Sequence, residues 1–328
     1  MSNFIDPKIV PKRKLYTGEE IPCIGMGTFG SDRFTSDQVS AAVAGAIRCG
    51  YRLFDCASVY GNEHLIGDVF DAAFKEGVVK REELFITSKV WNDQHGEVLK
   101  AAKKSLQDLK LDYIDCYFVH WPFPNYHAPG CDGDSRNPDS KPFSVDEFMS
   151  TWKQMEDLVD QGLVRTLGVS NVTIKKLEAI LPLCRIKPVI NEMELHPTFQ
   201  QQELFDYCVK NGIQPIGFCP IGSPTRPERD KTPDDIAAIE MPELIAVAKA
   251  HNVHPAVICL KWATQRGQIP IPFSIYENEY ASNLRCTTED PLTPAEMDTL
   301  KALDRNCRLI KGQVFLWEGA NDWNDLWD

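Results

Sequence analysis

Four residues that could move protons stand at the ends of short apolar runs or close to them. Asp55, Lys89 and His120 each follow such a run, and Tyr60 comes five residues after Asp55. Taken singly, each has an ordinary explanation, since a histidine that ends a strand usually hydrogen-bonds the scaffold and a lysine there is usually solvated. If the fold brings the four together, however, they form a set that can protonate a carbonyl oxygen.

The chemistry follows from the residue types. A phenol is a weak acid at neutral pH, but a neighbouring ammonium stabilises its phenolate, so Lys89 could assist Tyr60. Asp55 would hold Lys89 by an ion pair, and a neutral His120 would orient the substrate oxygen. None of these residues is a nucleophile beside a base, so a hydride would have to come from a cofactor.

Short apolar runs alternate with helical patterns along the chain, which is typical of β/α units around a parallel sheet. We expect strands in the runs Cys23–Gly27, Arg52–Phe54, Leu84–Thr87, Ile114–Val119, Val164–Val169, Pro188–Ile190, Gln214–Gly217 and Gln268–Ile271. We expect helices over Ser36–Arg48, Glu63–Lys75, Glu97–Leu109, Ser144–Gln161, Ile174–Leu181, Gln201–Lys210, Met241–His251 and Asn278–Leu284. A capping box at Ser144 and Glu147 and a terminating Gly162 support one of these helices.

Eight strands, each followed by a helix, predict a (β/α)8 TIM barrel, and the length of 328 residues suits one such domain over residues 1–328. Before it, Lys14-Leu15-Tyr16 and Ile21–Ile24 around Thr17-Gly18 predict an N-terminal β-hairpin. Two long connections, Trp121–Phe143 and Ser223–Glu240, are candidate active-site loops.

A barrel carries its chemistry at the carboxyl ends of its strands, so the polar residues there are the candidates for a site. Besides the four above, the predicted strands end at Ser170-Asn171, Asn191-Glu192 and Ser274. We expect these side chains to lie around one mouth of the barrel.

Composition excludes several classes of protein. Forty-seven acidic and 35 basic residues give a net charge of −12, which repels nucleic acids and anionic membranes. The 11 cysteines include no C-x-x-C pair, which predicts reduced thiols rather than a disulfide framework, and the seven histidines form no metal motif. No targeting segment is legible at the start, so we expect a soluble cytoplasmic protein. We expect it to act on a small molecule, and the sequence leaves open whether it is a monomer or a dimer.

Several motifs resemble those of the aldo-keto reductase superfamily, in its aldose reductase-like branch. They are IGMGTF at 24–29, LFDCASVYGNE at 53–63, TSKVWN at 87–92, YFVHWP at 117–122, GVSN at 168–171, INEMELHP at 190–197 and FCPIGSP at 218–224. The resemblance covers essentially the whole chain. It implies a barrel that reduces an aldehyde or ketone with a nicotinamide cofactor.

The resemblance also implies roles for individual residues. The catalytic tetrad would be Asp55, Tyr60, Lys89 and His120, with Tyr60 as the proton donor. The cofactor contacts would be Thr28, Ser170, Asn171, Glu192, Phe218, Gly222, Ser223, Phe273, Ser274, Glu279 and Asn283. Substrate would meet Phe29, Trp91, Trp121 and, in the tail, Trp317.

Two departures from the family pattern concern the cofactor. Glu192 replaces a glutamine beside the nicotinamide carboxamide, where a carboxylate can still accept a hydrogen bond. Phe273 and Glu279 replace the lysine and arginine that normally meet the 2′-phosphate of NADPH. We therefore expect NAD(H) to be preferred, with NADP(H) possible if Arg226 or Arg285 reaches the phosphate.

Other interpretations remain open. Gly25–Gly30 is a literal G-x-G-x-x-G, but Pro22 interrupts the approaching strand and the next helix begins too late for a Rossmann motif. The chain could instead be a polyol or sugar dehydrogenase working in the oxidative direction, or a non-catalytic barrel that only binds cofactor. Aromatic and polar residues in the loops suit either sugars or small aldehydes as substrates.

Overall fold

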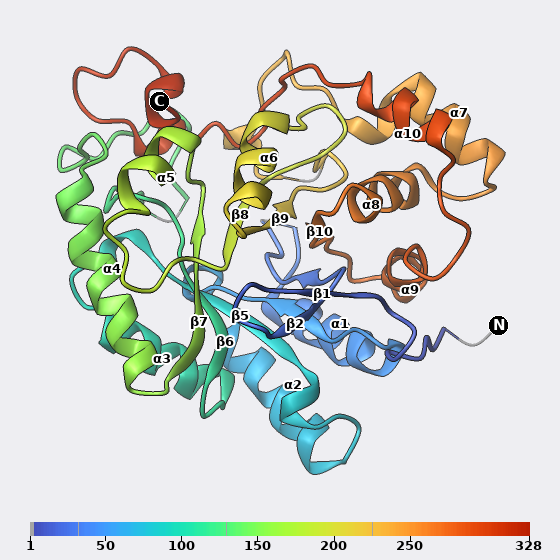
Figure 1. Ribbon diagram of the computed structural model, residues 1–328, viewed down its shortest axis with the longest axis horizontal. Helices are drawn as coiled ribbons and strands as arrows, with labels where there is room; N and C mark the ends of the chain where they lie inside the picture. The colour runs from blue at the N-terminus through green and yellow to red at the C-terminus, as the bar shows by residue number, and fades with distance from the viewer. Residues whose placement is uncertain (1–2, 32, 129, 225) are drawn as a thin grey trace.

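An eight-stranded parallel sheet, curled into a barrel, forms the centre of the molecule (Figure 1). The computed structural model describes residues 3–31, 33–128, 130–224 and 226–328. Its strands are β3 (Met26–Gly27), β4 (Leu53–Asp55), β5 (Phe85–Val90), β6 (Ile114–Val119), β7 (Val164–Ser170), β8 (Ile190–Glu194), β9 (Gln214–Phe218) and β10 (Ile269–Pro270). They pair in chain order, and backbone hydrogen bonds from Gly25 to Pro270 (3.0 Å) and from Gly27 to Pro272 (3.1 Å) close the two edges.

The central strands are buried on both faces, as parallel barrel strands must be. Every residue of β5 and β6 is buried, because one face packs inside the barrel and the other meets the helices. This explains why the sequence shows unbroken apolar runs there. It also corrects the predicted strand ends, since Lys89 lies inside β5 and both Asn191 and Glu192 lie inside β8 rather than beyond it.

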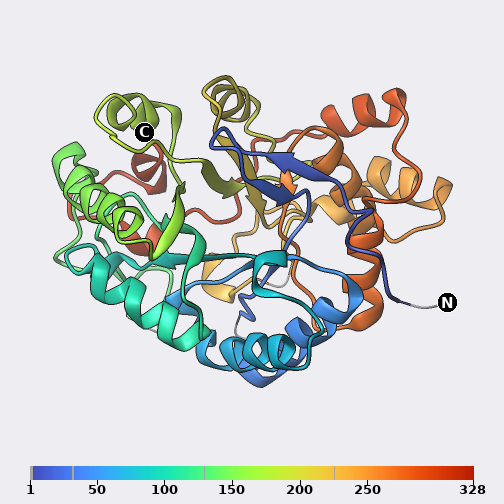
Figure 2. The same cartoon turned by 60° about the horizontal axis from the view of Figure 1, so that its bottom comes forward.

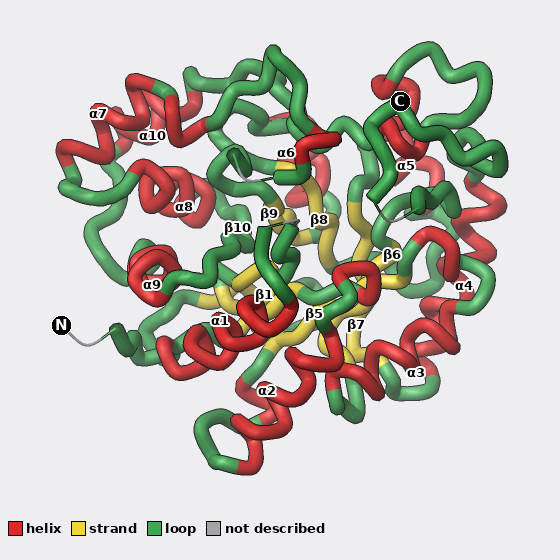
Figure 3. The backbone as a smooth tube through the Cα atoms, turned by 180° about the vertical axis from the view of Figure 1, so that it is seen from behind, coloured by secondary structure: helices red, strands yellow, loops and turns green. Residues whose placement is uncertain are grey.

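Helices surround the barrel, as Figure 2 and Figure 3 show from two further directions. The expected ones are α1 (Ser36–Cys49), α2 (Glu63–Lys75), α3 (Val98–Leu109), α4 (Val145–Asp160), α5 (Ile174–Ile180), α6 (Gln202–Lys210), α7 (Pro242–Ala250) and α9 (Glu277–Arg285). At the start of α4 the Ser144 side chain accepts from the Glu147 amide at 3.4 Å, whereas the Glu147 carboxylate pairs with Lys141, so only half of the predicted capping box forms. Gly162 after α4 has a φ of +71°, the left-handed conformation that we expected.

Among the described residues, two α-helices were not predicted: α8 (Pro255–Gln265) and α10 (Pro294–Lys301). Each begins with proline at its first position, where the missing N–H costs nothing. Within α8 the stretch 257–263 is buried throughout, so it lacks the polar face that marks an amphipathic helix.

The N-terminal hairpin consists of β1 (Lys12–Lys14) and β2 (Glu20–Pro22), which pair antiparallel. Leu15 and Ile21 pack with the residues that fill the barrel interior. The Tyr16 hydroxyl donates to the carbonyl of Lys187, just before β8, so the hairpin covers the amino ends of the strands. The other end of the barrel is left for the long loops.

The C-terminal tail runs back from α10 and lies beside α5 and the loop after β6 (Figure 1). Phe315 of the tail packs on Trp121 with ring centroids 4.6 Å apart. The Glu194 carboxylate of β8 accepts the backbone N–H groups of Leu309 (2.7 Å) and Ile310 (2.8 Å), which fixes the start of the tail. Among the described residues, no helix is long and apolar enough to cross a membrane.

Candidate active site

Asp55 and Lys89 form a buried ion pair at the carboxyl ends of β4 and β5. The Nζ atom of Lys89 lies 2.6 Å from both carboxylate oxygens of Asp55, and its side chain is 0% exposed. The Thr87 hydroxyl donates to the same carboxylate at 2.6 Å. Burial alone would lower the pKa of Lys89, but the charges of Asp55 and Glu192 raise it well above its usual value. The ammonium is therefore a permanent charge of this site.

Tyr60 lies next to this pair, at the end of the short helix η1 (Ser58–Tyr60). Its hydroxyl is 3.5 Å from the Nζ atom of Lys89. Burial raises the pKa of Tyr60, and the ammonium of Lys89 opposes that rise, as expected from the residue types, without overcoming it. The phenol thus carries its proton at neutral pH, which is the state a proton donor needs.

His120 follows β6 and faces Tyr60 edge-on, with ring centroids 5.9 Å apart. Burial lowers the pKa of His120 well below its usual value, and the charge of Lys89 and the neighbouring His95 add to this. The imidazole is therefore neutral at neutral pH, as the sequence predicted. Its Nδ1 atom is buried and meets no hydrogen-bond partner among the described residues.

Ser170 and Asn171 continue the site beyond His120. Asn171 takes up a left-handed conformation at φ +60°, and its Nδ2 atom donates to the carbonyl of His120 (3.0 Å) and to the Ser170 hydroxyl (3.2 Å). Its Oδ1 atom is buried and, within the described chain, unpaired. Asn191 of β8 donates instead to the Val172 carbonyl, away from this group.

Glu192 brings a second carboxylate to Lys89. Its Oε1 atom is 3.4 Å from the Nζ atom of Lys89, and its Oε2 atom has no partner among the described residues. Buried acceptors without donors are rare in native proteins. Asn171 and Glu192 each carry one, and the backbone amide of Asn171 donates to the carbonyl of Glu192, so the two residues are neighbours. Together they fit a bound group that presents an amide NH2, such as a nicotinamide carboxamide.

Aromatic side chains stand around the tyrosine and histidine. Phe29 lies 5.1 Å from the Tyr60 ring, and the two help to line a cavity with Phe34, Val39 and Asn62. Trp91 lies 4.9 Å from the His120 ring. Two of the four expected substrate contacts, Phe29 and Trp91, therefore lie next to Tyr60 and His120.

The other two aromatic residues expected at the substrate lie further out. Trp121 is only 6% exposed and packs on Phe315 and Trp327, and Trp317 packs against the same cluster. Two other aromatic rings lie close to Trp91 instead: the ring centroids of Phe315 and His127 are 6.0 and 5.8 Å from it. The sequence named neither residue, although His127 lies in the long loop expected at the active site, Trp121–Phe143, and Phe315 lies in the tail Gly312–Trp323, which the resemblance places around the substrate.

The remaining cofactor candidates lie along β3, β9 and β10 and the elements that follow. Thr28 donates to the backbone carbonyl of Asp55 at 2.8 Å, and Phe218 ends β9 beside the barrel interior. Gly222 has a φ of +79°, and a Cβ atom there would lie 2.5 Å from the Ala238 amide, so only glycine fits. Ser223, also at positive φ, follows directly.

Phe273 and Ser274 precede α9, Glu279 lies in its first turn, and Asn283 lies near its end. The Ser274 hydroxyl donates to the Glu279 carboxylate at 2.7 Å, the Phe273 ring lies 5.8 Å from Phe34, and Asn283 is buried in α9. The two arginines that the sequence offered as alternative partners of a 2′-phosphate, Arg226 and Arg285, have partners already. Arg226 pairs with Asp235 and donates to the Ser223 carbonyl, and Arg285 lies 3.4 Å from Glu289.

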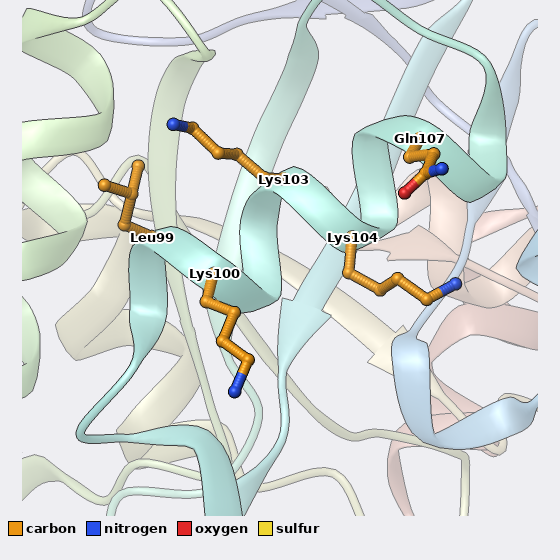
Figure 4. Close-up of a pocket in the computed structure, with 5 residues that line it drawn as sticks. All are labelled: Leu99, Lys100, Lys103, Lys104 and Gln107. Atoms are coloured by element: carbon orange, nitrogen blue, oxygen red, sulfur yellow. The ribbon is translucent and has the colours of Figure 1, made fainter.

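A second depression lies far from these residues, on the outer face of α3 (Figure 4). Leu99, Lys100, Lys103, Lys104 and Gln107 line it. Lys100 and Lys104 pair with Glu97 and Asp108 of the same helical region. It contains none of the residues that the sequence selected, and the depression is part of an ordinary charged helix surface.

Comparison with known proteins points the same way as the geometry. Residues 23–305 match the model of the aldo/keto reductase family. An aldo/keto reductase of Synechocystis is 39% identical over 320 residues, covering 96% of this chain and 95% of its own, and aldo-keto reductase family 1 member A1 of Xenopus tropicalis is 40% identical over 304 residues, covering 90% and 89%. A Bombyx mori aldo-keto reductase, solved in complex with NADP, superposes with a TM-score of 0.80 at 33% identity, over 92% of this chain and 95% of its own.

Proposed function

The chain belongs to the aldo/keto reductase family and is an NAD(P)H-dependent oxidoreductase that acts on aldehydes and ketones, and from that premise we propose that it reduces a small aldehyde or a sugar with NADH and that Tyr60 supplies the proton. The observation that carries this proposal is the contact between Tyr60 and the buried Lys89–Asp55 pair. A bound nicotinamide cofactor would supply the hydride. The residues of this chain would supply the proton and the geometry.

Tyr60 holds the proton that the substrate oxygen needs. As negative charge develops on that oxygen, the proton moves from the phenol, and the ammonium of Lys89, 3.5 Å away, stabilises the phenolate left behind. Asp55 keeps Lys89 in place and does not itself need to change its protonation state. In the oxidative direction the same tyrosine would act as the base.

His120 orients the substrate in this proposal. Because its pKa is far below neutrality, the ring can accept or donate a hydrogen bond without adding a charge. Phe29 and Trp91 would form apolar walls on either side of the reacting carbon. Such walls exclude water and suit either an aldehyde or the carbon chain of a sugar.

The preference for NADH rests on Phe273 and Glu279. An apolar ring and a carboxylate give a 2′-phosphate no cation to bind, and the carboxylate of Glu279 could accept a hydrogen bond from a free 2′-hydroxyl. Arg226 and Arg285, which could otherwise bind the phosphate, are already engaged by Asp235 and Glu289. The related Bombyx mori protein was solved with NADP, so this chain would differ from that relative in its cofactor.

We also propose that the chain forms one domain and works in a reducing compartment. Residues 1–328 would form one domain, since both the hairpin and the tail pack on the barrel. The 11 cysteines are all unpaired, which favours a reducing compartment such as the cytoplasm.

The test is oxidation of NADH with a nitrobenzaldehyde, followed by a panel of aldehydes, ketoses and polyols with both cofactors. Turnover that disappears in Tyr60→Phe supports the proposal. Cofactor binding with no turnover on any substrate would identify a non-catalytic barrel instead, and turnover only with polyols and NAD⁺ would favour the oxidative dehydrogenase.

A further inference from the structure

Two carboxylates compete for one ammonium in this site. Asp55 holds the Nζ atom of Lys89 with both oxygens at 2.6 Å, whereas Glu192 reaches it with one oxygen at 3.4 Å. Glu192 is 3% exposed, and its second oxygen, Oε2, meets no donor within the described chain. A buried carboxylate with so little compensation is the group that accepts a proton most easily.

The groups around Glu192 come from every neighbouring element. Asp55 lies on β4, Lys89 on β5, Cys116 on β6 and Tyr60 on η1, and all four affect its charge or are affected by it. The adjacent strands β7 and β9 place Ser170 and Ile216 opposite Glu192, and neither is charged. Glu192 therefore faces one cation, Lys89, and one carboxylate, Asp55, which disfavours its ionisation.

The electrostatics of Glu192 differ from those of Lys89, Tyr60 and Cys116. Burial raises the pKa of Glu192 to about 8, repulsion by Asp55 adds to the rise, and Lys89 opposes it. Burial also raises the pKa values of Tyr60 and Cys116, and Lys89 is held as the ammonium by its carboxylates. Of these groups, Glu192 is the one that changes charge near neutral pH.

We propose that the protonation state of Glu192 determines how tightly the site binds the oxidised cofactor relative to the reduced one. This inference rests on the proposed function, with the carboxamide of the nicotinamide cofactor at the unpaired oxygens of Asn171 and Glu192. The oxidised ring carries a positive charge and the reduced ring is neutral. An ionised Glu192 attracts the oxidised ring, and a protonated Glu192 does not.

The proton balance follows directly. When NAD⁺ binds, Glu192 loses its proton to solvent and faces the cationic ring as a carboxylate. When NADH binds, Glu192 keeps its proton and the site gains no charge. The enzyme thus releases oxidised cofactor more readily at lower pH, which favours reduction, and holds it at higher pH, which favours oxidation.

The experiment measures cofactor binding rather than activity. Dissociation constants of NAD⁺ and NADH, from protein fluorescence between about pH 6 and pH 9, should separate. The constant for NAD⁺ should fall by about tenfold over this range, because ionisation of a group with a pKa near 8 is coupled to binding, and that for NADH should change by less than about twofold. Glu192→Gln should bind both forms without this pH dependence.

A matched control is Glu203→Gln, which removes an exposed carboxylate on α6 and should behave as the wild type. Calorimetry of NAD⁺ binding to the wild type, in two buffers of different ionisation enthalpy, should show proton release near pH 7 and none for NADH, and it needs no variant to fold. Parallel pH dependence for the two cofactor forms, or a pH dependence that survives in Glu192→Gln, would overturn the proposal. Loss of all turnover on carbonyl substrates would count against the proposed function instead, and leaves these binding measurements valid.

Discussion

Lys89 donates to both carboxylate oxygens of Asp55, at 2.6 Å each, and its Nζ atom is closed off from solvent. The pair spans two adjacent strands, β4 and β5, and so fixes the ammonium relative to Tyr60. Breaking a buried ion pair costs about 3–5 kcal/mol, because the partner charge is left uncompensated. The same pair therefore stabilises the fold and, in the proposed mechanism, assists the proton transfer from Tyr60.

Replacement of Tyr60 by phenylalanine removes the proposed proton donor and little else. We expect kcat to fall by about 10²-fold or more, the usual contribution of positioned proton transfer. The affinity for cofactor should stay unchanged, which fluorescence titration would check. Tyr113→Phe, at the other end of the barrel before β6, is the control. Wild-type turnover by Tyr60→Phe would refute the assignment.

Lys89→Met should be similarly inactive, because a buried phenol without a neighbouring cation is too weak an acid. It should also lower the unfolding free energy by about 3–5 kcal/mol, since Asp55 and Glu192 lose their common partner. Steady-state kinetics and thermal melts measure the two effects separately. Lys103→Met, on the exposed face of α3 in Figure 4, should change neither.

His120→Ala should reduce kcat/KM most for bulky ketones, for which orientation matters more than for small aldehydes. Because the pKa of His120 lies well below its usual value, the wild-type profile should show no histidine step between about pH 5 and pH 7. A step in that range, or equal losses for every substrate, would assign His120 to proton transfer instead.

Stability should depend on pH through Glu192. Its pKa is raised on folding, to about 8, so the folded state binds more protons than the unfolded chain at pH values between the unfolded and folded pKa. The contribution of Glu192 is therefore fully present below its unfolded pKa and is lost as pH rises towards about 8. The slope is at most about 1.4 kcal/mol for each pH unit.

Glu192→Gln removes this loss. The Tm of the variant should equal that of the wild type near pH 5 within a degree or so, and exceed it by a few degrees near pH 8. Thermal melts of both proteins without cofactor, at matched ionic strength, measure the difference. A gap that narrows as pH rises would contradict the raised pKa.

The sequence predicted most of what positions the site, for physical reasons. Strands buried on both faces appear as unbroken apolar runs, so their order and the place of Asp55, Lys89 and His120 could be predicted locally. The two α-helices that the sequence did not predict lack the amphipathic pattern or the length that marks a helix. α8 is buried nearly all round and has no polar stripe, and α10 is short.

The long-range contacts of the site could not be predicted in this way. Glu194 anchors residues more than a hundred positions away, through the amides of Leu309 and Ile310. Phe315 contacts Trp91 because the tail returns to the barrel mouth. Such contacts depend on tertiary structure, and no periodicity of the chain encodes them.

Cofactor choice gives the last prediction. Each missing charged hydrogen bond to a 2′-phosphate costs about 1.5–3 kcal/mol, and each 1.4 kcal/mol is about a factor of ten in affinity. Even after screening, the Phe273 and Glu279 substitutions should give NADH at least a tenfold advantage in kcat/KM with one aldehyde. The double variant Phe273→Lys with Glu279→Arg should move the preference towards NADPH and leave the pH profile set by Tyr60 unchanged. Loss of the Ser274 bond to Glu279 in that variant frees the hydroxyl to meet the phosphate as well. Equal use of both cofactors by the wild type would show that another cation, such as Arg226 released from Asp235, reaches the phosphate.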